Sequence, residues 1–257
     1  MIGKQIRIER IMDRNTGKAV IIPMDHGMTL GQIDGLLNMT ETVAEVSDGG
    51  ANAIILHKGL VRPGHRRKGR DIGLIIHLSA GTSLNPDPND KVLICSVEEA
   101  VSLGADAVSI HINLGAPQES KMIESAGQVV RDCNRWGIPL LAMIYPRGKG
   151  IDPNNPVHVG HAVRVAEELG ADLVKTNYTG DPESFAKIVK ASSIPVLIAG
   201  GEKGEDIDTY RTIYDAVHFA KCAGVCMGRN AFQRDNVAKF VSNVSQVVHQ
   251  GARPETL

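Results

Sequence analysis

One lysine at the end of an apolar segment is well suited to covalent chemistry. Lys175 lies in the segment Asp172-Leu173-Val174-Lys175-Thr176, so a strand there would carry its amine to the edge of a sheet. Desolvation and nearby cations both lower the pKa of a lysine, which leaves more free amine to attack a ketone. Most lysines are merely solvated or salt-bridged, but a charge at the end of an interior strand is costly without a function. The position therefore predicts that Lys175 forms a Schiff base.

A second lysine competes for the same role. Lys58 ends the segment 53–58 in much the same way as Lys175 ends its own. Its alternative role is electrostatic, in which it either lowers the pKa of Lys175 or binds an oxyanion. The sequence alone does not separate the two lysines.

Two further polar residues follow apolar segments and could move protons. Tyr145 could exchange a proton with a substrate hydroxyl, although a tyrosine at this point could equally cap the core with its hydroxyl in water. Asp25 could hold a substrate hydroxyl or accept a proton during carbon–carbon cleavage. No partner near it in the sequence explains Asp25 structurally, which favours a function for it.

Glycines near the end of the chain have the pattern of a phosphate site. Gly200 and Gly201 follow one apolar segment, and Gly228 and Arg229 follow the next. Glycine lets backbone amides approach an anion, the start of a following short helix adds a favourable dipole, and arginine adds a fork of donors. These two pairs predict a phosphorylated substrate.

Eight apolar segments of strand length position these residues. They are rich in Val and Ile without polar alternation, which is typical of parallel strands covered on both faces. Helix signals lie between most of them, including a capping box at Ser96, a cap at Asp181 before a proline, and a terminating Gly170. The segments are 19–24, 53–58, 73–78, 107–112, 139–145, 172–176, 195–200 and 224–228.

A repeated junction favours a closed barrel over an open sheet. Gly50-Ala51-Asn52, Gly104-Ala105-Asp106 and Gly170-Ala171-Asp172 each lead into an even-numbered strand, with a related Ala223-Gly224 before the eighth. An open doubly wound sheet would normally place a glycine fingerprint after its first strand, where this sequence has Pro23-Met24-Asp25-His26-Gly27. We therefore predict an α/β fold, a single (β/α)₈ TIM barrel over residues 1–257. In such barrels the catalytic groups lie at the carboxyl ends of the strands.

The composition points to a small partner. The chain has 257 residues, with 28 Lys and Arg against 29 Asp and Glu, so it lacks the positive field that drives binding to nucleic acid or anionic membranes. No apolar run is long enough to span a membrane, and the charged amino terminus lacks a signal core. The four scattered cysteines are expected to be reduced thiols. Together these features predict a cytoplasmic protein.

Two other functions remain open from the residues alone. His57, His77 and His111 end three consecutive predicted strands and could hold a zinc ion, although it is unclear whether all three face inward. The phosphate site could also belong to a sensor without catalysis, which would not need the lysine. The basic run at residues 65–70 is expected to be solvated, or to recruit a second anionic group.

Taken together, the motifs resemble those of the archaeal-type class I aldolases, which include fructose-bisphosphate aldolases and heptulosonate synthases. The resemblance covers nearly the whole chain. It implies that Lys175 is the Schiff-base lysine and that Tyr145 and Asp25 are the acid/base pair. It is carried by Pro23-Met24-Asp25-His26-Gly27, His57-Lys58-Gly59, Tyr145-Pro146-Arg147-Gly148, Val174-Lys175-Thr176, Tyr178-Thr179-Gly180-Asp181, Ala199-Gly200-Gly201 and Gly228-Arg229-Asn230.

The same resemblance implies the rest of the site and its reaction. No metal or other cofactor is expected, because a protonated imine is the electron sink. Residues 73–82 and 178–181 look closer to the heptulosonate synthases, which implies transfer of an enamine from 6-deoxy-5-ketofructose 1-phosphate to aspartate semialdehyde, on a route to aromatic amino acids. The alternatives are a fructose-bisphosphate aldolase and an aldolase that joins dihydroxyacetone phosphate to the same semialdehyde. A homo-oligomer is also expected. The predicted substrate- or phosphate-binding residues are His26, Lys58, Arg147, Gly200, Gly201, Gly228 and Arg229.

Overall fold

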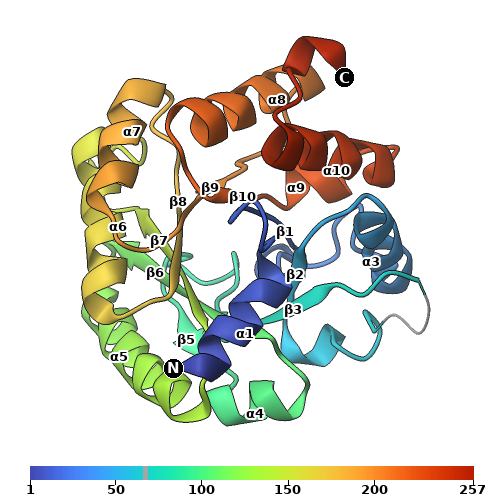
Figure 1. Ribbon diagram of the computed structural model, residues 1–257. Helices are drawn as coiled ribbons and strands as arrows, with labels where there is room; N and C mark the ends of the chain where they lie inside the picture. The colour runs from blue at the N-terminus through green and yellow to red at the C-terminus, as the bar shows by residue number, and fades with distance from the viewer. Residues whose placement is uncertain (66–68) are drawn as a thin grey trace.

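Eight parallel strands close into one barrel in the computed structural model, which describes residues 1–65 and 69–257. Each strand overlaps one of the eight predicted segments, so the predicted TIM barrel is confirmed. Around the ring the order is β1, β10, β9, β8, β7, β6, β3 and β2 (Figure 1). The strands are β1 (Ala19–Pro23), β2 (Ala53–Leu56), β3 (Gly73–His77), β6 (Ala107–Leu114), β7 (Leu140–Pro146), β8 (Leu173–Thr176), β9 (Val196–Ala199) and β10 (Gly224–Cys226).

Alternation along the strands separates two apolar cores. Ile21, Ile55 and Leu173 belong to the cluster inside the barrel, whereas their neighbours Ile22 and Ile54 belong to the cluster between strands and helices. Successive side chains of a strand point to opposite faces. In β1, β2, β3, β6, β7 and β8 the odd-numbered residues therefore face inward, and the polar residues that continue this series meet at the carboxyl end of the barrel.

Helices surround the barrel. Their predicted signals are confirmed: Asp181 accepts the backbone N–H of Ser184 at 2.8 Å, Ser96 accepts that of Glu99 at 3.0 Å, and Gly170 ends its helix with a φ of 89°. No helix in the described part of the chain is both long and apolar enough to cross a membrane. The main helices are α1 (Ile2–Ile11), α3 (Met39–Asp48), α4 (Val97–Ser102), α5 (Glu119–Trp136), α6 (Pro156–Leu169), α7 (Pro182–Ala191), α8 (Asp206–Tyr214) and α10 (Val237–Ser245), with short α2 (Gly27–Leu30) and α9 (Arg229–Phe232).

The repeated Gly-Ala-Asx junctions link neighbouring strands by hydrogen bonds at the amino end of the barrel. In each of them the Asx side chain accepts the backbone N–H of a residue 32 positions earlier, on the odd-numbered strand before it. The side-chain oxygen of the Asn or Asp thereby accepts a backbone N–H at the start of the neighbouring strand, where a buried unpaired N–H would be costly. The bonds run from Val20 to Asn52 (2.7 Å), from Leu74 to Asp106 (2.9 Å) and from Leu140 to Asp172 (2.9 Å).

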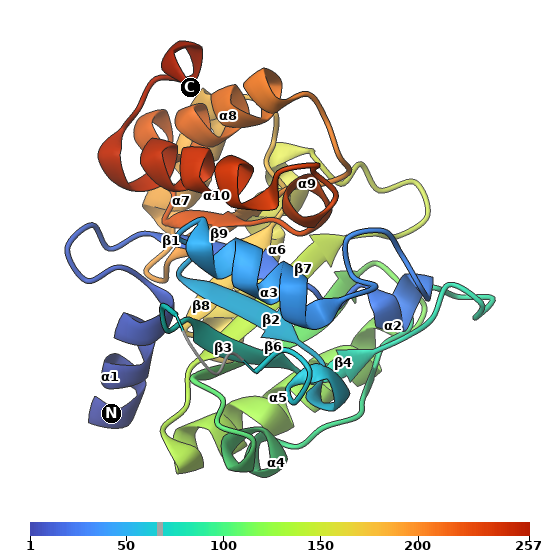
Figure 2. The ribbon, with the colours of Figure 1, turned by 90° about the vertical axis from the view of Figure 1, so that its right-hand side faces the viewer.

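Helix α1 covers the same end. Lys4 donates to Asp172 at 2.8 Å, and Arg10 pairs with Asp106 and Asp71. Ile11, at the end of the helix, is fully buried in the inner cluster. Figure 2 shows α1 at one end of the barrel and α2 and β4 at the other. The amino end is thereby closed, and the opposite end is left for a site.

A small hairpin that the sequence did not predict lies beyond β3. Its strands β4 (Ser79–Ala80) and β5 (Val92–Leu93) pair antiparallel, and residues 85–91 lie in the loop between them. Between β2 and β3, by contrast, the described residues contain only the 3-10 turn η1 (Lys58–Leu60).

Candidate active site

A cavity of about 370 Å³ lies at the carboxyl end of the strands. Polar residues from seven strand ends and from the β4–β5 hairpin converge on it, as expected for a TIM barrel. They include Asp25, His26, His57, His77, Ser79, Asn89, Lys91, His111, Tyr145, Arg147, Lys175 and Arg229. All three residues predicted to be catalytic therefore line one cavity.

Lys175 lies at the inner wall of this cavity and is only 8% exposed. Burial alone would lower the pKa of Lys175, but its interactions with Cys226, Tyr145 and Asp25 outweigh burial and hold this pKa above its ordinary value. The sequence-based expectation of a lowered pKa was wrong for the substrate-free enzyme. The cations expected to repel the amine are outweighed by groups that stabilise its charged form.

Asp25 is the anion that holds the lysine charged at neutral pH. Burial raises the pKa of Cys226 to about 11 and also raises that of Tyr145, so both stay protonated near pH 7. Burial alone would raise the pKa of Asp25 as well, but the facing His77, His26 and Lys175 outweigh it and hold this pKa far below its ordinary value. The resting site therefore contains a partly buried carboxylate and a buried ammonium.

Histidines surround the carboxylate of Asp25. Its Oδ2 lies 3.7 Å from Nε2 of His77, and its Oδ1 lies 3.5 Å from Nδ1 of His26. Burial lowers the pKa of His77 to about 4 and lowers those of His26 and His57. These imidazoles are therefore neutral near pH 7, and Lys175 is the cation that faces Asp25.

His57, His77 and His111 form a row along one wall, and all three face inward. The ring centroids are 5.3 Å apart for the first pair and 6.5 Å for the second. His77 uses Nδ1 in a 2.8 Å bond with Ser109, and His111 uses Nε2 in a 2.8 Å bond with Asn113. Within residues 1–65 and 69–257, no group of three or more His, Cys, Asp or Glu side chains is placed to hold a metal ion. The geometry gives no support to the zinc hypothesis.

Tyr145 is buried between cationic and aromatic neighbours. It is 4% exposed, and its phenol interacts with the Lys175 amine through a hydrogen bond. The guanidinium of Arg147 lies 4.4 Å from the centre of the Tyr145 ring, and the ring of His111 meets it edge-on at 5.1 Å. The alternative of a tyrosine with its hydroxyl in bulk water is therefore wrong, and the phenol can exchange protons within the site.

Arg229 brings the predicted phosphate-binding segment to the cavity. Its Nε is buried without a hydrogen-bond partner, and its Nη1 donates to Glu202 at 3.3 Å. A Cβ on Gly228 would lie 2.4 Å from Cε1 of His26, so this glycine makes room for the imidazole. Gly200 lines a neighbouring pocket instead. Arg229 and His26 thus share the cavity with Lys175, whereas Gly200, Gly201 and Gly228 are not among the residues that line it.

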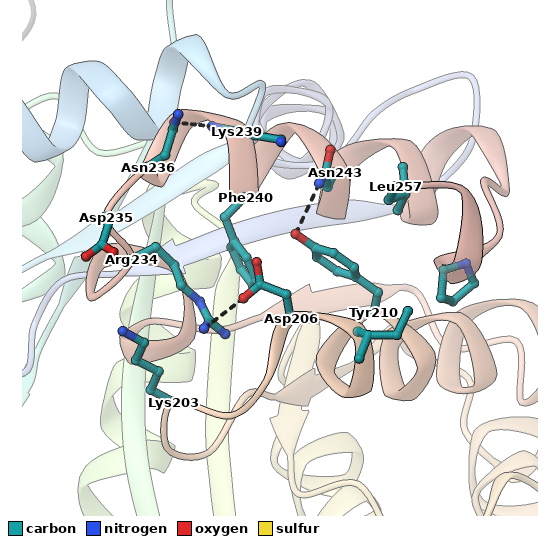
Figure 3. A pocket seen from close by; sticks show the side chains of 12 residues that line it. Lys203, Asp206, Tyr210, Arg234, Asp235, Asn236, Lys239, Phe240, Asn243 and Leu257 are labelled. Atoms are coloured by element: carbon teal, nitrogen blue, oxygen red, sulfur yellow. Dashed lines mark hydrogen bonds and ion pairs between the residues drawn. The ribbon is translucent and has the colours of Figure 1, made fainter.

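The loop after β9 is held by residues that sequence reasoning missed. Asn230 is buried, and its amide donates to the carbonyls of Gly200 (2.6 Å) and Glu202 (2.7 Å). Arg234 binds the Asn230 side chain and also pairs with Asp206 at 2.8 Å, in a second pocket between α8 and α10 (Figure 3). Asn230 belongs to the quoted Gly228-Arg229-Asn230 motif, so a signal was present.

Lys58 does not line the cavity with Lys175. As an even-numbered residue it continues the outward series of Ile54 and Leu56, and its ammonium pairs with Glu99 at 3.0 Å. It lines a separate outer groove with those two residues and His65. The sequence offered Lys58 as a competing nucleophile, or as a group that lowers the pKa of Lys175 or binds an oxyanion. None of these roles is supported, because alternation turns its side chain away from the cavity. Within the basic run, residues 66–68 lie outside the described residues.

Comparison with protein families decides what kind of barrel this is. The model of the DeoC/LacD family of aldolases matches residues 19–234, which include all of the barrel strands. The chain belongs to this family. Because this is a family of aldolases, the match favours an enzyme over the alternative of a non-catalytic sensor.

Similar proteins have two kinds of name. A 2-amino-3,7-dideoxy-D-threo-hept-6-ulosonate synthase of Halobacterium salinarum is 46% identical, over 98% of this chain and 94% of its own. A 2-amino-4,5-dihydroxy-6-oxo-7-(phosphonooxy)heptanoate synthase of Streptomyces griseus is 40% identical, over 96% and 90%. An archaeal fructose 1,6-bisphosphate aldolase structure has a TM-score of 0.87 and 35% identity, covering 96% and 99%. A Schiff-base-forming fructose-1,6-bisphosphate aldolase has a TM-score of 0.86 and 33% identity, covering 95% and 98%.

Proposed function

We propose that this aldolase is a 2-amino-3,7-dideoxy-D-threo-hept-6-ulosonate synthase that works through a Schiff base on Lys175. The observation that carries the proposal is the buried Lys175 amine, in contact with the Tyr145 phenol and facing the Asp25 carboxylate. The 46% identity to a relative of that name, over 98% of the chain, supports the choice of reaction. We infer that the substrates are a small phosphorylated keto-sugar and an aldehyde.

The structure of this product shows which bond must form. It has a ketone at C6 and hydroxyls at C4 and C5, so an aldol addition joins C4 to C5. Carbons 1–4 then come from an aldehyde with a 2-amino group and a carboxylate, which is aspartate semialdehyde. Carbons 5–7 come from a three-carbon enamine, which 6-deoxy-5-ketofructose 1-phosphate supplies when its bond between C3 and C4 breaks.

The first half of the reaction builds the imine. Lys175 passes a proton to the facing Asp25, and the free amine then attacks C5 of the donor ketone. Loss of water leaves a protonated imine, whose nitrogen accepts electrons. A base removes the proton from the C3 hydroxyl, the bond between C3 and C4 breaks, and its electrons form the enamine while carbons 1–3 leave as a phosphorylated aldehyde.

The second half reverses these steps on the new aldehyde. The enamine carbon attacks the aldehyde of aspartate semialdehyde, and the alkoxide that forms takes a proton from an acid in the site. Water then hydrolyses the imine and releases the product and Lys175. We assign the proton transfers at the substrate hydroxyl to Tyr145, because its phenol lies beside the amine, and the transfers at nitrogen to Asp25.

One observation favours a second candidate. The Streptomyces relative is named for a product with a phosphonooxy group on C7, where the first product has hydrogen. Arg229, with a buried Nε that has no partner, offers an anion site that such a group could fill. In this alternative the enamine comes from dihydroxyacetone phosphate, and the predicted phosphate-binding glycines serve that same group.

Product analysis separates the candidates. The enzyme is given aspartate semialdehyde with either 6-deoxy-5-ketofructose 1-phosphate or dihydroxyacetone phosphate, and in parallel fructose 1,6-bisphosphate alone. We expect the first pair to react fastest and borohydride to trap the donor on Lys175. Preference for dihydroxyacetone phosphate selects the second candidate, and preference for fructose 1,6-bisphosphate overturns both.

Three further features of the protein stay predictions. We propose that residues 1–257 act as one domain, that the enzyme forms a homo-oligomer, and that it works in the cytoplasm. All four cysteines are free and buried, which is compatible with reduced thiols. Light scattering of the purified chain tests the oligomer directly.

A further inference from the structure

We propose that Lys91 and Arg147 form one anion subsite that holds the phosphate of the departing aldehyde and then the carboxylate of the incoming aldehyde. This inference rests on the proposed synthase reaction, and it adds a residue that sequence reasoning did not select. It also explains how one small cavity handles two different aldehydes in turn.

Lys91 reaches the cavity from the β4–β5 hairpin. It is half-buried and lines the cavity together with Asn89 of the same loop. Its ammonium donates to the carbonyl of Pro88 at 2.8 Å. The charges of Asp87 and Asp90 act on Lys91, yet neither carboxylate lines the cavity or forms an ion pair with it. The ammonium therefore keeps donors for a ligand.

Arg147 supplies the second cation. It follows the end of β7, and stacking on the Tyr145 ring at 4.4 Å fixes its guanidinium at the cavity wall. Within the described residues no carboxylate pairs with it. Arg147 contributes, after burial, to lowering the pKa of Lys91, and both cations act on the half-buried His111. The two positive charges thus share one region of the cavity.

The cavity holds little negative charge to neutralise this pair. Asp25 is the one carboxylate among the described residues that line it, and Asp25 faces His77, His26 and Lys175. Two neighbouring cations, neither of which forms an ion pair with a carboxylate among the described residues, favour an anionic ligand, and an arginine fork suits a carboxylate or phosphate equally well.

The ring order places this pair on the acceptor side. From β8, which carries Lys175, the neighbouring β7 leads through β6 to β3 and its hairpin, whereas β9 and β10 lead the other way to Arg229. Tyr145 lies on β7, so the hydroxyl that it protonates belongs to the aldehyde on the same side as Arg147. Arg229 faces the other end of the enamine.

The two aldehydes present their anions at similar distances. In the departing fragment of 6-deoxy-5-ketofructose 1-phosphate, phosphorus is four bonds from the aldehyde carbon. In aspartate semialdehyde, the carboxylate carbon is three bonds from it. One flexible lysine and one arginine can follow this small difference, so the two anions compete for the same subsite and bind in turn.

The substitution Lys91→Gln tests the subsite. We expect kcat/KM for aspartate semialdehyde, and for the six-carbon donor, to fall at least about tenfold, because charge-assisted hydrogen bonds are the strong ones. Lys91→Arg should restore most of the loss. Succinic semialdehyde keeps the carboxylate and butanal lacks it, so the preference of the unaltered enzyme for the former should shrink in Lys91→Gln.

The controls separate this inference from the proposed function. Lys149→Gln removes an exposed lysine that does not line the cavity, and it should leave these kinetics unchanged. Borohydride trapping of dihydroxyacetone phosphate reports the Lys175 amine and the integrity of the barrel independently. Unchanged use of both aldehydes by Lys91→Gln overturns the subsite alone. If the unaltered enzyme traps dihydroxyacetone phosphate but never uses aspartate semialdehyde, both proposals fall.

Discussion

The two ends of the barrel each contain a carboxylate that interacts with a lysine, by an ion pair at the amino end and through the charge of Lys175 at the carboxyl end. At the amino end Asp172 accepts the backbone N–H of Leu140 and the ammonium of Lys4, at 2.9 and 2.8 Å. At the carboxyl end Asp25 has imidazole neighbours at 3.5 and 3.7 Å and the buried ammonium of Lys175. Asp172 is held by two hydrogen bonds to its Oδ2, whereas Asp25 faces groups with which it can exchange protons.

Buried side-chain nitrogens without a hydrogen-bond partner follow the same division. Within the described residues, buried nitrogens without a partner include Nδ1 of His57 and Nε of Arg229, both at the cavity. The Asx side chains of the amino end instead satisfy strand amides. A buried polar group without a partner costs stability. The comparison teaches that this barrel is stabilised at one end and keeps unpaired polar groups at the other, where substrate can pair with them.

The largest effect should come from removing the lysine of the carboxyl end. Lys175→Met removes the nucleophile, so kcat should fall by more than about a thousandfold and borohydride should no longer trap a ketose phosphate. The free energy of unfolding should stay the same or rise, because a buried charge is lost. Trapping that persists in this variant would move the Schiff base to another lysine.

A smaller loss of activity should follow when the carboxylate is neutralised. Asp25→Asn should lower kcat by about a hundredfold, the range typical of a lost acid/base group. Since Asp25 holds the pKa of Lys175 up, the amine of the variant should lose its proton at lower pH. The pH profile of borohydride trapping should therefore shift to lower pH. A shift to higher pH would show that burial does not favour the free amine here.

The matched change at the amino end should affect stability and not catalysis. Lys4→Met leaves Asp172, which is 19% exposed, with the Leu140 amide as its remaining donor. We expect the free energy of unfolding to fall by roughly 1 kcal/mol, because the pair is partly solvated. Urea denaturation measures this loss, and kcat should change less than about twofold. A large loss of kcat would show that the two ends are coupled.

The smallest expected effect is on the stability of the protein at acidic pH. The pKa of His77 is about 4 in the folded protein, below the ordinary 6.5, because burial disfavours the charged ring. Between pH 6.5 and about 4, the His77 ring is therefore protonated in the unfolded chain but neutral in the folded chain. The free energy of unfolding should fall as the pH falls through this range. His77→Gln should flatten this part of the curve of unfolding free energy against pH. An unchanged slope would assign the acid sensitivity to other groups.

Most of the fold could be predicted from the sequence, because it depends on local patterns. Uninterrupted Val and Ile segments indicated the buried parallel strands, and the Asx residues of the repeated junctions proved to bind strand amides. The β4–β5 hairpin was not predicted because each of its strands is only two residues long. The prediction that Lys58 reaches the Lys175 cavity was wrong, although alternation along the strand from Ile54 could have predicted that its side chain points outward.

The sequence by itself determined which residues end the strands, and hence that Lys175, Tyr145 and Asp25 meet at one cavity. Only the tertiary structure decided that this lysine is charged and which groups surround the Asp25 carboxylate. These depend on groups from β1, β3, β7 and β10 that closure of the barrel brings together, and the strength of a buried charge interaction depends on distances that no local pattern contains. Lys91 joined the site for the same reason, since a hairpin from β3 had to fold over the cavity first.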